Sequence, residues 1–110
     1  MNELKTELRK ILERHEGRDH AITGMELARI LNQRDDRRIR ILIRELIIEG
    51  LPVASTTSQP AGYFIPESYE EAREYAESIR RRLIEAAIRR RDFRRAADCH
   101  LRLAKQGKLI

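Results

Sequence analysis

The chain of 110 residues is long enough for a single domain with a modest hydrophobic core. Charged residues make up 37% of it, and Lys and Arg exceed Asp and Glu by 23 to 18, so the formal net charge is +5 and a polyanionic partner is compatible with the composition. Cys99 is the one cysteine, which excludes an internal disulfide, and no apolar run approaches the length of a membrane span.

The first segment, residues 2–17, predicts an amphipathic helix that ends at Gly17, a natural C-terminal cap. The following stretch RDHAI, residues 18–22, predicts a short extended piece. Thr23 and Glu26 have the spacing of a capping box, so they predict the start of a second helix, which is followed by a brief turn over residues 32–34. The apolar positions of the two helices are Leu4, Leu8, Ile11 and Leu12, then Leu27, Ala28, Ile30 and Leu31.

The segment DDRRIRILIRELIIEGLPV, residues 35–53, alternates arginine with branched aliphatic residues, a pattern that alone indicates a half-buried strand. A helix over residues 36–49 accounts for it better, because the apolar residues recur at helical spacing and the segment is long for a strand. Asp35 is a suitable N-cap, and Gly50 followed by Pro52 is a suitable stop. The helix places Ile39, Leu42, Ile43 and Leu46 on one stripe and Arg37, Arg40, Ile41 and Arg44 on a different face.

The stretch PVASTTSQPAGYFIP, residues 52–66, predicts a β-hairpin, because two short β-branched or aromatic pieces flank the turn residues SQPAG. Ser68 and Glu71 have the spacing of a second capping box, which predicts a last helix from Tyr69 almost to the C-terminus. We therefore expect a fold that is mainly α with a small β-hairpin, in the α+β class.

The order helix, short strand, helix, turn, helix and hairpin resembles a winged helix-turn-helix domain. The chain is most similar to the small winged-helix proteins often encoded by phages and prophages, whose motifs are T-G-x-E-L-A, R-x-[IV]-R-x-x-[IV]-x-x-L and G-x-P-[IV]. The resemblance covers roughly residues 3–66 and implies a winged helix-turn-helix domain over 1–66, followed by a C-terminal helical extension over 67–110. The matching residues are Thr23, Gly24, Glu26, Leu27 and Ala28; Arg37, Ile39, Arg40, Ile43 and Leu46; Gly50, Pro52 and Val53; and Gly62 and Tyr63.

The resemblance implies double-stranded DNA as the partner, with helix 36–49 in the major groove, where guanidinium groups bind phosphates or guanine edges. Ile41 departs from the family pattern, which has a polar or basic residue there, and is open to a thymine-methyl contact, a protein contact or a place in the core. The wing holds no Lys or Arg between Ser55 and Tyr63, which leaves its phosphate contacts to hydroxyls and amides. The expected DNA-binding residues are Thr23, Gln33, Arg34, Arg37, Arg38, Arg40, Ile41, Arg44, Thr57 and Ser58.

Apolar residues of the last helix follow alternating three- and four-residue steps, the pattern of a coiled-coil seam, which only Arg90 and His100 interrupt. The early part of the helix is acidic and the later part basic, so we predict a homodimer with antiparallel helices. Two alternatives stay open: the seam packs on the winged helix of its own chain, or the helix breaks near RRRDF, residues 89–93, into a two-helix tail. The expected dimerisation residues are Tyr69, Ala72, Ala76, Ile79, Leu83, Ala86, Phe93 and Ala97.

These features predict a DNA-binding transcriptional regulator, acting as a dimer in the cytoplasm and associated with the nucleoid. A protein–protein interaction module, such as a replication or regulatory adaptor, is the alternative, which the uncharged wing and the outward Ile41 and Ile48 favour. An enzyme is not expected, because the sequence holds no nucleophile–base pair, no phosphate-cradling glycine loop and no metal cluster. We expect no cofactor, metal, small-molecule ligand or membrane partner.

Overall fold

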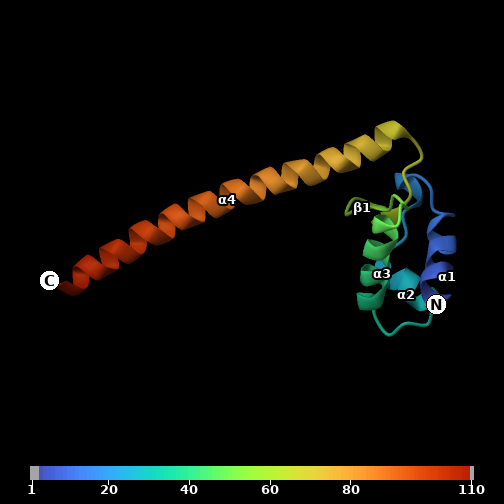
Figure 1. Cartoon of the computed structure of the whole chain (residues 1–110), viewed down its shortest axis with the longest axis horizontal. Coiled ribbons are helices and arrows are strands. Elements are labelled where there is room, and N and C mark those ends of the chain that lie inside the picture. Colours follow the sequence, from blue (N-terminus) through green and yellow to red (C-terminus); the bar gives the residue numbers. More distant parts are fainter. Residues whose placement is uncertain (1–2, 110) are drawn as a thin grey trace. The chain divides into compact units, whose positions relative to one another are not determined.

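The computed structural model describes residues 3–109, which are mainly helical with one two-stranded antiparallel hairpin, so the predicted α+β class is confirmed (Figure 1). Residues 1, 2 and 110, at the outer ends of the predicted domains 1–66 and 67–110, lie outside the described residues. The chain divides into two compact units between Tyr75 and Ala76. The elements are α1 (Glu3–Leu12), the 3-10 helix η1 (Arg18–His20), α2 (Gly24–Ile30), α3 (Arg37–Ile48), β1 (Ala54–Thr56), β2 (Gly62–Phe64) and α4 (Tyr69–Leu109).

The core of the first unit lies among α1, α2 and α3, and both α1 and α2 contact α3. Each helix turns an apolar stripe inward, as the helical spacing predicts. Burying one such leucine or isoleucine stabilises the fold by about 1.5–3 kcal/mol. The largest fully buried side chains are Leu8, Leu12, Leu27, Ile39, Leu42 and Leu46.

The helix predicted to run to Gly17 ends at Leu12 instead. The backbone after it is taken up by long-range pairing: Ile65 N–H donates to His15 O and Gly17 N–H donates to Ile65 O, both at 2.8 Å. Gly17 has φ +87°, which suits a glycine at the end of this pairing. We infer that the helix stops here because residues 15–17 pair with Ile65, the residue directly after β2.

The prediction of an extended piece over residues 18–22 is wrong for its first half, where η1 forms. Ala21 has extended backbone angles, and Ile22 pairs with Tyr63, the two residues exchanging N–H···O bonds of 2.9 and 2.7 Å. In the hairpin Ala54 is opposite Phe64, Ser55 opposite Tyr63 and Thr56 opposite Gly62. The predicted hairpin is confirmed. Outside it, the pairing consists of two single-residue bridges, Ile22 with Tyr63 and Glu16 with Ile65.

The predicted caps are partly correct. Thr23 Oγ1 accepts the Glu26 N–H at 3.1 Å, as a capping box requires. The Glu26 carboxylate binds Arg29 instead of accepting the Thr23 N–H. The N-cap of α3 is Asp36 and not Asp35, because α3 begins at Arg37. The Asp35 carboxylate nevertheless accepts the Arg37 N–H at 3.1 Å, so it satisfies a free amide of the first turn as a cap does.

The start of α4 is joined to the first unit. Ser68 Oγ accepts the Glu71 N–H at 3.1 Å, while the Glu71 carboxylate accepts the N–H groups of Glu67 and Arg18 at 2.9 and 3.2 Å. One turn later the Tyr75 hydroxyl lies 3.4 Å from Ser55 Oγ in β1. These contacts explain why the first unit extends to Tyr75.

From Tyr69 to Leu109 the backbone of α4 is continuous, so the alternative of a break near residues 89–93 is wrong. Glycine is the residue most disruptive to such a helix after proline, and the one glycine within α4 is Gly107, close to its end. The residues RRRDF are good or neutral helix formers, which gives the helix no reason to stop there.

Candidate nucleic-acid interface

One face of α3 is buried and the opposite face is exposed. Ile39, Leu42, Ile43 and Leu46 are at most 4% exposed, as predicted. On the opposite side, residues at spacings i, i+4, i+7 and i+11 form a line along the helix. We call this line the outward face of α3: Arg37, Ile41, Arg44 and Ile48.

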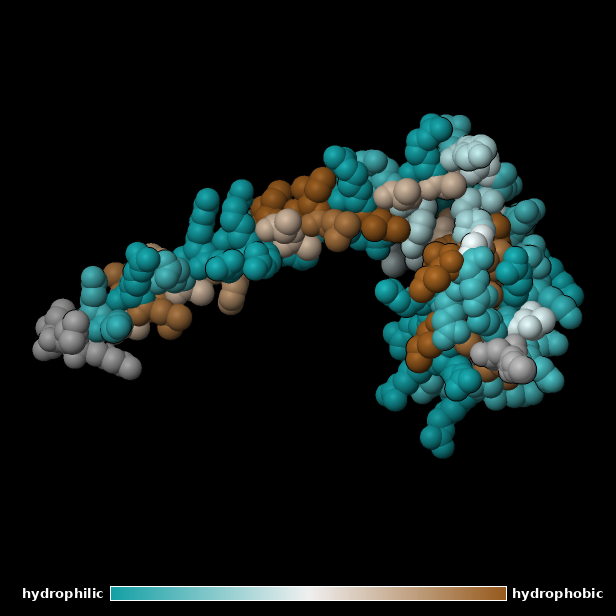
Figure 2. Space-filling model, in the orientation of Figure 1, coloured by the Kyte–Doolittle hydropathy of each residue, from teal (hydrophilic) through white to brown (hydrophobic). Residues whose placement is uncertain are grey.

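Arginine and isoleucine alternate along the outward face. Ile41 is 58% and Ile48 76% exposed, so Ile41 has no place in the core. Figure 2 shows these two kinds of surface over α3, with apolar side chains set among hydrophilic ones. The face therefore offers guanidinium groups and branched aliphatic groups together.

Of the predicted arginines Arg37, Arg40 and Arg44 on α3, two have acidic neighbours. Arg37 Nε lies 3.9 Å from Asp35 Oδ2, and a nitrogen of Arg40 lies 3.5 Å from Asp36 Oδ1. Both guanidinium groups stay in solvent, with side chains 83% and 60% exposed. Arg44 makes no ion pair with any of residues 3–109. The three arginines are thus accessible, with two of them partly neutralised.

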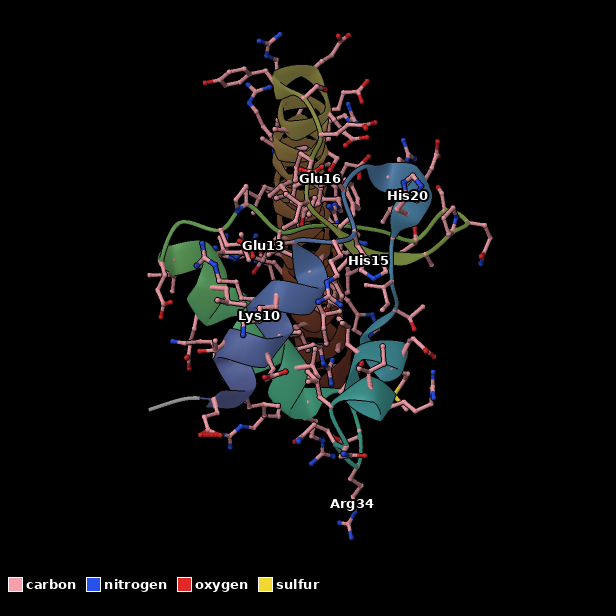
Figure 3. All side chains as sticks on the ribbon, turned by 90° about the vertical axis from the view of Figure 1, so that its right-hand side faces the viewer. Lys10, Glu13, His15, Glu16, His20 and Arg34 are labelled. Atoms are coloured by element: carbon pink, nitrogen blue, oxygen red, sulfur yellow. The ribbon has the colours of Figure 1, made fainter. Side chains whose placement is uncertain are left out.

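The turn before α3 supplies the other predicted basic residues. Arg34 projects from this turn, away from the helices (Figure 3). Arg38 is exposed on the flank of α3 that faces away from Arg40. Gln33 is less available, because it is half-buried and its side-chain amide donates to Leu31 O at 3.1 Å. Thr23 is exposed, with its hydroxyl oxygen already accepting at the start of α2.

The hairpin tip carries no charge. Thr57 and Ser58 are exposed, as a contact with phosphate requires. The Ser58 N–H donates to Thr56 Oγ1 at 3.1 Å, which holds the turn in shape. The tip can therefore offer hydroxyl groups and backbone amides to a partner, but no cation.

Tyr63 is not among the predicted site residues, although it lies where the hairpin meets the start of α3. Burial raises the pKa of its hydroxyl, and the Asp36 carboxylate raises that pKa further while Arg40 lowers it. Its ring also lies 3.5 Å from the position that a Cβ on Gly24 would take. The signal in the sequence is an aromatic residue directly after Gly62, which by itself indicates only a strand.

The predicted dimerisation residues lie along one helix and most are exposed. Tyr69 is 89%, Ile79 40%, Leu83 66% and Phe93 71% exposed, and Ala76 and Ala86 are also exposed. Ala72 and Ala97 are half-buried. Ile84 and Ile88, each 44% exposed, are further large apolar residues outside the predicted seam.

Within residues 3–109, no three His, Cys, Asp or Glu side chains are placed to hold a metal ion, and none of the helices is long and apolar enough to cross a membrane. The two exposed surfaces of the described residues are thus the outward face of α3 and the apolar seam of α4. Comparisons of the chain with protein-family models, with curated proteins and with solved structures found no match.

Proposed function

We propose that the first unit is a winged helix-turn-helix domain that binds double-stranded DNA, and that the chain acts as a transcriptional regulator. In this proposal α3 enters the major groove and the β1–β2 hairpin is the wing. The observation that carries the proposal is the outward face of α3, which sets exposed arginines directly opposite a fully buried stripe. An order of elements like that of the family adds support.

The dimensions of α3 suit a groove. Arg37 and Arg44 are seven residues apart, which corresponds to about 10 Å along the helix axis. The major groove of B-DNA is about 12 Å wide, so both guanidinium groups can reach a groove wall or a base edge. Ile41, between them, fits the methyl group of a thymine, an apolar contact that major-groove readers use.

The acidic neighbours of Arg37 and Arg40 do not prevent this use. Exposed ion pairs contribute roughly 0–1 kcal/mol, because solvent screens them and their side chains lose entropy on pairing. A phosphate or a guanine edge offers each guanidinium a paired hydrogen bond of comparable or greater strength. We infer that Asp35 and Asp36 hold the arginines in position until DNA replaces them as partner.

The apolar seam of α4 is the proposed dimerisation element. Its large side chains Ile79, Leu83 and Phe93 are exposed, and a second copy is the partner that brings two α3 helices to a two-fold symmetric site. Half-sites in such a target lie about one helical turn of DNA apart, or a multiple of it.

The test is fluorescence anisotropy of labelled duplex DNA, titrated at several salt concentrations with wild type and with the α3 variant Arg37→Ala/Arg40→Ala/Arg44→Ala. Each phosphate that the variant no longer binds lowers the slope of log affinity against log salt by about 0.9. A matched control removes the same number of positive charges from the first unit away from α3: Lys10→Ala/Arg14→Ala/Arg18→Ala, of which Lys10 is seen on α1 in Figure 3.

We expect the α3 variant to bind at least about tenfold more weakly than this control, with a smaller salt slope. Equal affinities for the two variants would show that α3 does not bind DNA, since both proteins carry the same net charge.

A protein–protein interaction module is the second candidate. The observations that favour it are Ile41 and Ile48, which are large, apolar and exposed on the outward face, and the uncharged hairpin tip. Apolar side chains at the centre of an exposed face are common in interfaces that exclude water. Equal DNA affinity of the α3 variant and its control would favour this candidate.

A further inference from the structure

Positive charge is divided very unevenly between the two units of the chain. Residues 1–75 hold 12 Lys and Arg against 14 Asp and Glu, a net charge of −2. Residues 76–110 hold 11 Lys and Arg against 4 Asp and Glu, a net charge of +7. All the excess positive charge of this basic protein is therefore in the second unit, whose described part is the portion of α4 after Tyr75.

Most of the arginines in this part of α4 have no acidic partner. Arg80, Arg91 and Arg102 pair with an acid one to four residues away. Among residues 76–109, five other arginines have side chains that make neither an ion pair nor a hydrogen bond with any described residue, and all five are exposed: Arg81, Arg89, Arg90, Arg94 and Arg95.

The arginines surround α4 and do not form one face. Successive residues of a helix point about 100° apart, so the runs 80–82 and 89–91 direct guanidinium groups to all sides. The large apolar residues are also split, because the pair Ile84 and Ile88 points about 140° away from Ile79 and Leu83. Because Arg90 lies within the apolar seam and arginines surround the rest of the helix, α4 has no face free of charge, unlike a helix that lies on a membrane.

From this arrangement we infer that the part of α4 after Tyr75 is a second DNA-binding element, which grips the phosphates of a duplex without reading its sequence. Guanidinium groups that lie outside the seam, such as those of Arg81, Arg89 and Arg95, stay accessible when the seam is paired, so they can bind the phosphates of a duplex that lies against α4. Arginine, which outnumbers lysine by nine to two in residues 76–110, also binds phosphate through paired hydrogen bonds. The inference rests on the proposed function only in taking duplex DNA as the polyanion.

Such a division of labour follows from the charges. A folded unit of net charge −2 gains no long-range attraction to DNA, so the first unit contributes only the phosphate contacts that the arginines of α3 make. Residues 76–110 carry +7 and supply the long-range attraction together with further phosphate contacts. In the whole chain, α4 holds the protein on DNA and α3 distinguishes one site from another.

The test uses the full chain with arginines of α4 replaced by glutamine, a good helix former that removes the charge. Circular dichroism checks that the helix content is unchanged. A matched control removes five positive charges from the first unit outside α3, so that both variants have net charge 0. The α4 variant is Arg81→Gln/Arg89→Gln/Arg90→Gln/Arg94→Gln/Arg95→Gln, and the control is Arg9→Gln/Lys10→Gln/Arg14→Gln/Arg18→Gln/Arg29→Gln.

Each protein is titrated against a labelled duplex of mixed sequence over a range of salt, and against vesicles that contain phosphatidylserine. We expect the α4 variant to lower the salt slope by about 4 and the low-salt affinity by at least about a hundredfold relative to the control. An α4 variant with the slope of its control would overturn the inference, and so would a wild-type chain that binds the vesicles but not the duplex.

Failure of this inference is distinct from failure of the proposed function. The proposed function is tested by Arg37, Arg40 and Arg44 against their own matched control, whatever the α4 variant does. If only the α3 variant binds DNA more weakly than its control, the inference about α4 is wrong and the proposed function is supported. If only the α4 variant does, the inference is supported and the proposed role of α3 is wrong.

Discussion

The Glu71 carboxylate accepts a hydrogen bond of 3.2 Å from the backbone N–H of Arg18, two residues that are 53 positions apart in the chain. The other oxygen of the same carboxylate accepts the Glu67 N–H at 2.9 Å. One side chain thus joins the segment after α1 to the first turn of α4. The capping residue of one helix is here also a tertiary contact.

Glu71→Ala is therefore expected to lower the free energy of unfolding of the first unit by about 1–2 kcal/mol, because two backbone amides lose a charged acceptor. Glu70→Ala is the matched control, since Glu70 is exposed, lies in the same turn, and has a side chain that makes no ion pair or hydrogen bond with any of residues 3–109. Urea denaturation followed by tyrosine fluorescence measures both. Equal destabilisation of the two variants would mean that the effect comes from the helix start alone.

Gly62→Ala is expected to destabilise the first unit by about 2–5 kcal/mol. Gly62 has φ +129°, and a Cβ there would lie 2.2 Å from Ile22 O, so the added methyl group meets backbone that cannot turn aside. The control is Gly107→Ala, where nothing lies within 4 Å of the new Cβ and the helix gains a better residue. Thermal unfolding compares them, and a mild effect at Gly62 would contradict the close pairing of Ile22 with Tyr63.

Stability is expected to fall in alkaline solution. The folded state raises the pKa of Tyr63, mainly by burial, and the pKa of Lys5, mainly through its hydrogen bond to Glu49. A raised pKa means that the folded state holds the proton more tightly, so this stabilisation is present below the unfolded values of 10.0 and 10.5 and is lost as the pH rises through the folded values.

Urea denaturation at a series of pH values from about 8 to 11 measures this effect. Tyr63→Phe should flatten the alkaline decline, whereas Tyr69→Phe, at a side chain that is 89% exposed, should leave it unchanged. An equal decline in wild type and Tyr63→Phe would remove Tyr63 as a cause.

Self-association and DNA binding are expected to respond to salt to different degrees. In the predicted antiparallel dimer the acidic early part of one α4 lies against the basic later part of its partner, so salt screens this attraction but leaves the burial of the apolar seam. Sedimentation velocity should therefore show a dimer that weakens only modestly as salt rises, whereas DNA binding falls steeply, and Leu83→Glu should remove the dimer. Gln106→Glu, which adds the same charge away from the seam, is the control, and a dimer that Leu83→Glu leaves unchanged would contradict an apolar seam.

The sequence predicts an element of this fold well when the residues that determine its bounds lie within or next to the element itself. The helix predicted over residues 36–49 forms over Arg37–Ile48, because its buried stripe and its stop signals lie within the segment. The end of α1 is predicted at Gly17 and lies at Leu12, because the backbone of residues 15–17 pairs with Ile65, about 50 positions away. When a helix ends because its next residues pair with a distant part of the chain, the local sequence pattern does not predict that end.

The candidate site divides in the same way. That Arg37, Ile41 and Arg44 share an outward face follows from helical geometry alone. That Arg40 pairs with Asp36 also follows from spacing, because the two are four residues apart. That Tyr63 lies near them depends on how the hairpin packs by the start of α3. Spacing along one helix therefore predicts which side chains are exposed together and which pair locally, but not which of them meet a residue from elsewhere in the chain.

The length of α4 sets a scale for the complex with DNA. From Ala76 to its end at Leu109 the helix is about 50 Å long, at a rise of 1.5 Å per residue. B-DNA rises about 3.4 Å per base pair, so a duplex bound along this part of α4 is covered over about 15 base pairs. The protein should then protect a longer stretch of DNA from nuclease than α3 alone can cover.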